Sequence, residues 1–410
     1  RIRLFFEGAA IGIFTGIIIS ALRFLIDLAD IYRPMWFKNF SGAADFLITF
    51  AAIIFLAKFL SAAMIFDNQV GGSGVPQIKK ILQGKTEMTK PLRLLIVKFL
   101  SVLLAISAGM SLGRAGISVQ FGACVGEIFS AKNKILLAAG AGAGFSAIFS
   151  APLAGVIFCI EELHKKFTAE TLVATTAASV SAAAVAELVF GVRPIFETIT
   201  AAQAENPLKY FFYFIMLAIF IGAIGAIFTK TLLLSLKIFE RLQVNLFYKI
   251  LLPLILIVPL GKFLPEILGC GNVLVDDLLS KKFLFATVVI FFVGKFLFTL
   301  ICFGTNTPGG IFLPLLTVGA LGGNIFAQIC IGLNLFSAEL TTLFIIFGMA
   351  AMFAAVVKSP ITGSILILEL TGQFSYLLML IIVSVVAFII SDICGGEGIF
   401  SALMNRKKSV

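Results

Sequence analysis

The chain has 410 residues, of which 60% are hydrophobic and 13% are charged, and its formal net charge is +10. Soluble globular domains contain roughly 45–50% apolar and about 25% charged residues, so this composition excludes an ordinary water-soluble protein. The apolar residues form continuous runs rather than alternating patterns, which excludes a transmembrane β-barrel. The composition predicts an α-helical protein with about ten or more membrane spans of about 20 residues each.

The apolar runs recur along the whole chain, and their lengths differ. The runs at 3–31 and 208–236 exceed the length that one perpendicular helix needs, which predicts tilted helices, whereas 360–371 is too short to cross. In chain order, the runs cover residues 3–31, 44–66, 91–110, 135–160, 170–191, 208–236, 249–264, 283–303, 311–336, 340–357, 360–371 and 374–394.

Basic residues gather in short clusters between these runs, for example Lys79, Lys80 and Lys85. Such clusters are typical of the loops and headgroup-facing ends of membrane helices, so we expect a lipid bilayer as the partner and no nucleic acid. The six cysteines stand in apolar surroundings without a Cys-x-x-Cys motif, and we expect them to be small buried side chains. With one histidine and no metal-ligand cluster, the sequence indicates no metal site, no cofactor and no enzyme.

Glycine-rich breaks separate several runs, at Gly71–Gly74, Gly113–Gly116, Gly269–Gly271 and Gly309–Gly310. Non-helical backbone at membrane depth is stable only where protein buries it or water lines it. Broken helices of this kind form the binding sites of many transporters, so one interpretation is a secondary transporter for an organic anion or cation.

An internal repeat relates the two halves of the chain. Adding 197 to early positions, and 208 after an insertion of 11 residues, superimposes glycines, prolines and a glutamate, with pairs that include Gly72 with Gly269, Gly113 with Gly310, Pro152 with Pro360 and Glu161 with Glu369. We predict two structural repeats, residues 1–195 and 206–405, that meet near the midplane of the membrane. They are inverted if each contains an odd number of crossings.

Three segments have the pattern of helix starts at bilayer depth. They are Gly72-Ser73-Gly74-Val75-Pro76, Gly113-Arg114-Ala115-Gly116-Ile117 and Gly310-Ile311-Phe312-Leu313-Pro314. Helix N-termini present unpaired N–H groups and the positive end of the macrodipole, so they favour an anion. Because these charges are partial, a bound anion can also leave, as transport requires.

On these motifs the sequence resembles the CLC family of chloride channels and chloride/proton antiporters, whose signatures are G-S-G-I-P, G-R-E-G-P and G-x-F-x-P. The resemblance implies an all-α polytopic membrane protein with two inverted repeats of tilted and broken helices. It also implies a homodimer with one pore in each subunit. The expected substrate is chloride, with other halides or nitrate as alternatives.

The resemblance also implies roles for individual residues. Chloride would bind Ser73 and Gly74 of the first motif, the backbone amides of Ile311 and Phe312, and Phe400, which stands where the family has a tyrosine. A serine at position 73 favours chloride over a fluoride or nitrate specialisation.

The second motif departs from the family at the gating glutamate, which is Ala115 here, with Gly113, Arg114, Gly116 and Ile117 around it. Ile117 replaces the family's proline, a milder change. Glu162 matches the internal proton-transfer glutamate of the antiporters. We therefore expect passive chloride movement without coupled protons. The alternative is that Ala115 is an engineered substitution in an antiporter.

Other residues have simpler interpretations. Small residues over 138–144 are expected to form a packing surface between helices. Arg114 is expected to pair with a buried carboxylate or the backbone rather than to bind the anion. Glu161 and Glu369 are expected to cap or bridge helix ends.

The chain ends soon after Phe400, so we expect no cytoplasmic regulatory domains and a prokaryotic protein of the inner membrane.

Overall fold

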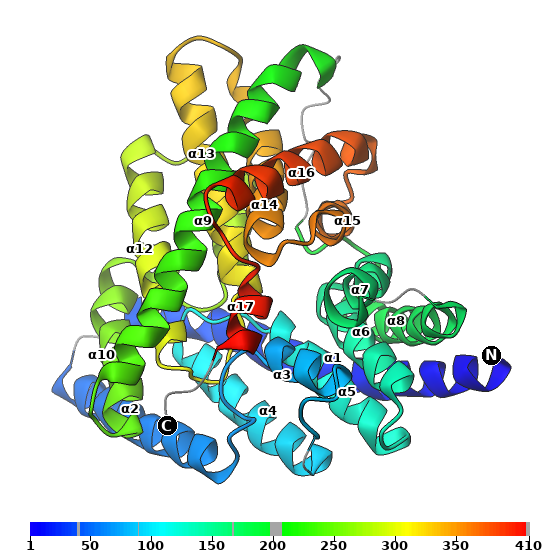
Figure 1. Ribbon diagram of the computed structural model, residues 1–410. Coiled ribbons are helices and arrows are strands. Elements are labelled where there is room, and N and C mark those ends of the chain that lie inside the picture. The colour runs from blue at the N-terminus through cyan, green and yellow to red at the C-terminus, as the bar shows by residue number, and fades with distance from the viewer. Residues whose placement is uncertain (39–41, 89, 166–167, 197–206, 407–410) are drawn as a thin grey trace.

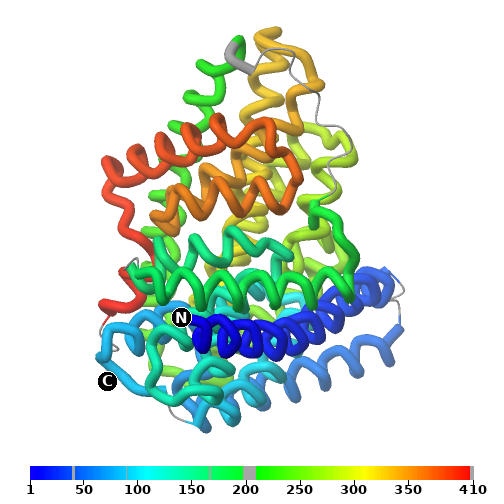
Figure 2. The backbone as a smooth tube through the Cα atoms, turned by 90° about the vertical axis from the view of Figure 1, so that its right-hand side faces the viewer, coloured from blue at the N-terminus to red at the C-terminus, as the bar shows by residue number. Residues whose placement is uncertain are grey.

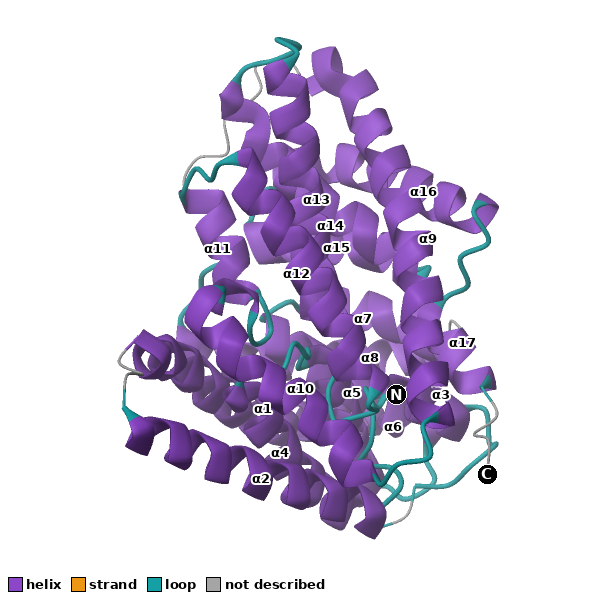
Figure 3. Ribbon diagram, turned by 90° about the vertical axis from the view of Figure 1, so that its left-hand side faces the viewer, coloured by secondary structure: helices purple, strands orange, loops and turns teal. Residues whose placement is uncertain are grey.

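The computed structural model describes residues 1–38, 42–88, 90–165, 168–196 and 207–406. The described residues form helices and loops and no strand (Figure 3). Ten of their helices are long and apolar enough to cross a membrane, as the composition predicts. The predicted start of the second repeat, residue 206, lies outside the described residues.

The described residues of the first half form eight α-helices and one π-helical turn, and in Figure 1 they occupy the lower part of the molecule. Figure 2 shows its two long helices, α1 and α8, running side by side. The elements are α1 (Ile2–Lys38), α2 (Ala43–Phe66), α3 (Val75–Leu82), α4 (Pro91–Ala108), α5 (Ala115–Phe129), α6 (Lys134–Phe149), α7 (Pro152–Phe158), the π-helical turn η1 (Cys159–His164) and α8 (Ala169–Phe190).

Within residues 207–406, the second half forms nine α-helices, most of them in the upper part of Figure 1, with short 3-10 turns between some of them. They are η2 (Pro207–Tyr210), α9 (Phe211–Arg241), α10 (Leu246–Phe263), η3 (Pro265–Ile267), α11 (Asn272–Ser280), α12 (Phe285–Gly304), α13 (Phe312–Gly332), η4 (Ala338–Leu340), α14 (Thr341–Val357), α15 (Pro360–Thr371), η5 (Phe374–Tyr376), α16 (Leu377–Ile393) and α17 (Ile399–Asn405).

The apolar run 135–160 divides into α6 and α7 at Pro152, which lacks the N–H that a continuing helix needs. Five of the six cysteines are buried as expected, but Cys394 is exposed at the end of α16.

The glycine-rich breaks lie in the loops before α3, α5, α11 and α13, as the sequence predicts. Gly72 and Gly74 have φ values of 70° and 89°, and their repeat partners Gly269 and Gly271 have 66° and 97°. This left-handed backbone is accessible to glycine at little cost because it has no Cβ. The same backbone path is therefore required in both repeats.

The two halves are joined about a local two-fold axis. Gly113 N–H donates to Gly310 O and Gly310 N–H donates to Gly113 O, both at 2.6 Å, as an isolated antiparallel bridge. Because residues 113 and 310 are repeat partners, this reciprocal pairing places the axis between them. The halves are inverted, as the family resemblance implies.

Further hydrogen bonds repeat the same symmetry. Gly72 N–H donates to Asn306 O at 3.0 Å, and Gly269 N–H donates to Gly109 O at 2.9 Å. The offset of 197 relates Gly72 to Gly269 and Gly109 to Asn306, so each of these hydrogen bonds is the symmetry copy of the other. The axis therefore relates the whole loop region around Gly113 and Gly310.

Small residues let α5 and α6 approach closely, as expected for the run 138–144. A Cβ atom on Gly140 would collide with the carbonyl oxygen of Gly122, and one on Gly122 would collide with Gly140 O. Their repeat partners, Gly319 of α13 and Gly348 of α14, have the same relation. Backbone contact of this kind is a common way for membrane helices to associate.

We predict that G140A lowers the stability of the folded protein, by about 1–3 kcal/mol, because the added methyl group overpacks the α5–α6 contact. Thermal unfolding in detergent measures the effect. The matched control is G332A at the end of α13, where a Cβ would meet nothing within 4 Å. Equal unfolding temperatures for the two variants would contradict the proposed role of Gly140.

Candidate functional site

Two helix N-termini are held at the centre of the molecule by the Gly113–Gly310 bridge. Helix α5 begins at Ala115 and α13 begins at Phe312, each two residues after its bridge glycine. The first N–H groups of a helix have no partner within that helix. The bridge therefore aims two sets of such N–H groups at one region.

Glycine at the bridge keeps these N–H groups accessible. A Cβ on Gly113 would lie 3.2 Å from Phe312 N and 3.1 Å from Leu313 N, in the space in front of the α13 terminus. A Cβ on Gly310 would lie 3.3 Å from Gly116 N of α5. A side chain at either position would fill the space in front of these N–H groups.

The hydroxyl of Ser73 lies next to this region, just before α3. Ser73 is 2% exposed, and its Oγ has no hydrogen-bond partner among the described residues. A Cβ on Gly116 would lie 2.9 Å from Ser73 O, so the start of α5 packs directly against Ser73. An unpaired buried hydroxyl is energetically costly, and this one is available to donate a hydrogen bond to a ligand.

A cavity of about 650 Å³ lies elsewhere, between α1, α2, α4 and α10, but Ser73 lines a different one of about 290 Å³. Gly72, Asn306 and Arg406 also line the smaller cavity. The smaller cavity is the one relevant here, because Ser73 is one of its lining residues.

Phenylalanine rings enclose the α13 terminus. The ring centroid of Phe312 lies 5.2 Å from that of Phe400 and 5.4 Å from that of Phe353. Phe145 and Phe158 complete the cluster, at 5.5 and 5.7 Å from Phe312. Phe400 lies on α17, which packs against α3, so the cluster and Ser73 belong to one region (Figure 1). These apolar rings exclude water and strengthen the electrostatic effect of the N–H groups.

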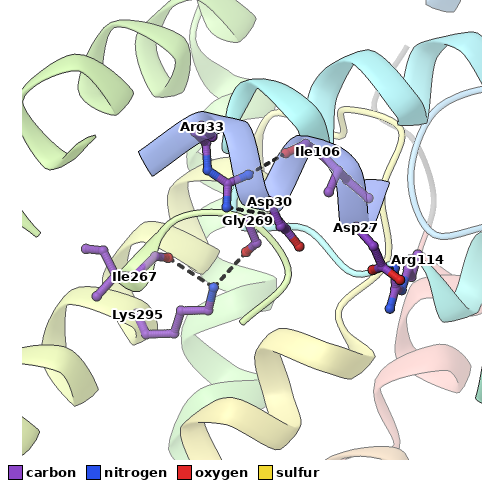
Figure 4. A network of polar contacts seen from close by, with 8 residues as sticks. All are labelled: Asp27, Asp30, Arg33, Ile106, Arg114, Ile267, Gly269 and Lys295. Atoms are coloured by element: carbon purple, nitrogen blue, oxygen red, sulfur yellow. Dashed lines mark hydrogen bonds and ion pairs between the residues drawn. The ribbon is translucent and has the colours of Figure 1, made fainter. Parts of the chain in front are cut away.

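Ala115 is fully buried at the first position of α5, as are its neighbours Gly113, Gly116 and Ile117. Arg114 does not contribute a free charge here. Its Nη1 donates to Asp27 Oδ1 of α1 at 2.6 Å, as expected from the sequence (Figure 4).

Figure 4 also shows a buried lysine that the sequence analysis missed. Lys295 of α12 is fully buried and donates to Ile267 O at 3.0 Å and to Gly269 O at 2.7 Å. Beside it, Arg33 pairs with Asp30 at 2.8 Å. The ammonium group of Lys295 therefore stabilises the loop that precedes α11.

Lys98 of α4 has the equivalent role in the first repeat. It is fully buried and donates to Gln120 Oε1 at 2.5 Å and Gln69 O at 3.4 Å, in the loop before α3. The offset of 197 relates Lys98 to Lys295 and could have identified the pair from the sequence. Each lysine donates to at least one backbone carbonyl oxygen of a helix-break loop, which stabilises the unwound backbone.

The glutamates expected at helix ends cap the opposite repeat. Glu161 accepts hydrogen bonds from Ile361 N at 3.3 Å and Thr362 N at 2.7 Å, at the start of α15. Glu369 accepts from Leu153 N at 3.0 Å and Ala154 N at 2.8 Å, at the start of α7. These residues are repeat partners: Glu161 with Glu369, Leu153 with Ile361, and Ala154 with Thr362. Both glutamates have the structural role predicted for them.

Glu162 has a partner that the sequence analysis did not predict. Lys79 Nζ lies 2.6 Å from Glu162 Oε1, and both side chains are almost completely buried. The expectation that Lys79 faces lipid headgroups is therefore wrong. Lys79 lies on the buried side of the short helix α3, whereas the next residue, Lys80, lines the same cavity as Ser73.

Comparison with known proteins agrees with this geometry. The profile of the voltage gated chloride channel family matches residues 49–392. The H(+)/Cl(-) exchange transporter ClcA of Vibrio vulnificus is 34% identical over 99% of this chain and 90% of its own, and that of Vibrio cholerae is 35% identical over 98% and 89%.

Solved structures show the same fold. A slow cyanobacterial Cl-/H+ antiporter superimposes with a TM-score of 0.91 at 28% identity, over 98% of this chain and 97% of its own. A CLC-type fluoride/proton antiporter superimposes with a TM-score of 0.78 at 21% identity, over 95% of both chains.

Two inverted repeats, paired helix N-termini and these matches define a membrane transport protein rather than an enzyme. The chain belongs to the voltage gated chloride channel family, the CLC family. It is an integral, multi-pass membrane protein, and its bacterial relatives support an inner-membrane location.

Proposed function

We propose that this protein carries chloride across the bacterial inner membrane by a passive route, without coupled proton movement and without a cofactor. The proposed chloride site is supported chiefly by the unpaired, buried hydroxyl of Ser73 beside the N-termini of α5 and α13. The backbone groups of Gly74, Ile311 and Phe312 and the ring of Phe400 would complete it. All five residues are buried in the structure.

Such a site suits an anion that must both bind and leave. Helix N-termini supply partial positive charge. Arg114 of the second motif is paired with Asp27 and adds no unpaired positive charge. The site therefore attracts chloride without the strong retention that an unpaired buried cation would cause.

Ala115 is the reason for proposing uncoupled transport. Its position is where the resemblance expects a gating glutamate, at the end of α5 that faces the site. A methyl group can neither carry a proton nor compete with chloride for the N–H groups. The relatives named above are exchangers, so proton coupling that survives without this carboxylate is the alternative.

We predict that purified protein in liposomes conducts chloride down its gradient while no proton moves against its own gradient. Simultaneous recording with a chloride electrode and a pH electrode measures both fluxes. A coupled exchanger of the family, reconstituted in parallel, is the positive control. Uphill proton movement driven by a chloride gradient through the unmodified chain would contradict the proposal.

We predict that S73A weakens chloride binding about tenfold or more, because a hydrogen bond to a charged group contributes roughly 1.5–3 kcal/mol. Isothermal titration with chloride measures the loss, and bromide and nitrate titrations test the wider anion preference. S101A is the matched control, because the buried Ser101 hydroxyl already donates to Val97 O of its own helix. Unchanged affinity in S73A would remove Ser73 from the site.

We also propose a homodimer, as the family resemblance implies. The repeat partners Leu153 and Ile361 lie at the starts of α7 and α15, which pack together, and are 57% and 49% exposed. They form an apolar face close to the local axis, suited to a second copy. Light scattering in detergent is expected to give twice the chain mass of 44.0 kDa, and a value equal to one chain would contradict the dimer.

A further inference from the structure

The ion pair between Lys79 and Glu162 connects three elements around the proposed pore. Lys79 lies on α3, directly after the Ser73 motif, and Glu162 lies on the π-helical turn η1. Lys79 Nζ also donates to Ser401 Oγ of α17 at 3.2 Å, next to Phe400. Glu162 Oε2 accepts from Ser359 Oγ at 3.3 Å. Both carboxylate oxygens of Glu162 are therefore held.

The burial of both groups determines how Glu162 behaves. The side chains of Lys79 and Glu162 are 2% and 4% exposed. A buried carboxyl group without a partner favours its neutral, protonated form, because the charged form is poorly solvated. An ammonium group at 2.6 Å opposes that preference, because it stabilises the charged form of the carboxyl group. Separating the pair leaves an uncompensated charge, which is strongly unfavourable.

A carboxyl group that relays protons must take up a proton and release it in every cycle. Protonating Glu162 here would leave the Lys79 ammonium group buried without its counter-ion. The same step would weaken the link through which Lys79 holds α17 and Phe400 near α3. The ion pair thus opposes the protonation that a relay needs.

We propose that Lys79 is a positioning residue that locks Glu162 as a fixed carboxylate, so that the inner end of the proton path is closed independently of Ala115. The inference rests on the proposed uncoupled function and deepens it, because it gives the chain two separate barriers to protons. Glu162 then serves to anchor α3 and α17 around the chloride site.

The first test introduces a glutamate in place of Ala115, both with Lys79 present and with Lys79 replaced. We expect A115E alone to show chloride-driven proton movement close to background. We expect proton movement in A115E/K79M to be about tenfold or more above that in A115E, because lowering a barrier by about 1.4 kcal/mol speeds a step tenfold. A115E/K79R keeps the cation and is expected to behave like A115E. Chloride flux in each variant verifies that the protein is folded.

The outcomes separate this inference from the proposed function. Proton coupling in the unmodified chain contradicts both the passive function and the proposed role of Lys79, whereas the comparison between A115E and A115E/K79M tests the role of Lys79 alone. Coupling in A115E as strong as in A115E/K79M overturns the lock. Absence of coupling in A115E/K79M, with chloride flux retained, overturns it as well.

A second readout does not depend on transport. Infrared spectra of K79M are expected to gain the carbonyl stretch of a protonated carboxylic acid, which K79M/E162Q lacks and K79R does not gain. If K79M does not fold, K79Q makes the same comparison, since its amide can hydrogen-bond the carboxyl group. No new band in a folded Lys79 variant would show that Lys79 does not set the protonation of Glu162.

Discussion

The reciprocal hydrogen bonds between Gly113 and Gly310 fix the geometry on which the rest of the site depends. They join the two repeats about a local axis and hold the starts of α5 and α13 beside each other. Helix N-termini attract anions only weakly when they act alone in water. Beside the phenylalanine rings around Phe312, they would form a preorganised site for the proposed anion.

Buried basic side chains bond to the loops around these N–H groups. Lys98 and Lys295 bond to carbonyl oxygens of the helix-break loops, and Arg114 is paired with Asp27. They satisfy backbone groups that would otherwise be unpaired inside the membrane. The structure thus separates two tasks: buried cations stabilise the unwound loops, and backbone dipoles face the proposed pathway.

The sequence predicted the parts of this arrangement that depend on local backbone chemistry. Glycines with positive φ, such as Gly72 and Gly269, mark loops that other residues would strain. Repeat arithmetic paired Glu161 with Glu369, and both cap the opposite repeat. The contact of Lys79 with Glu162 was not predictable in this way. It joins residues 83 positions apart, and a lysine within a basic cluster normally indicates an exposed membrane edge.

The central claim is that the interrupted helices bind a halide beside Ser73. Crystals soaked in bromide test it directly, because bromide scatters anomalously and replaces chloride in a site built from hydrogen-bond donors. The account predicts an anomalous peak within hydrogen-bond distance of Ser73 Oγ and the backbone N–H groups of Ile311 or Phe312. Bromide peaks only at exposed lysines, with none at this position, would contradict it.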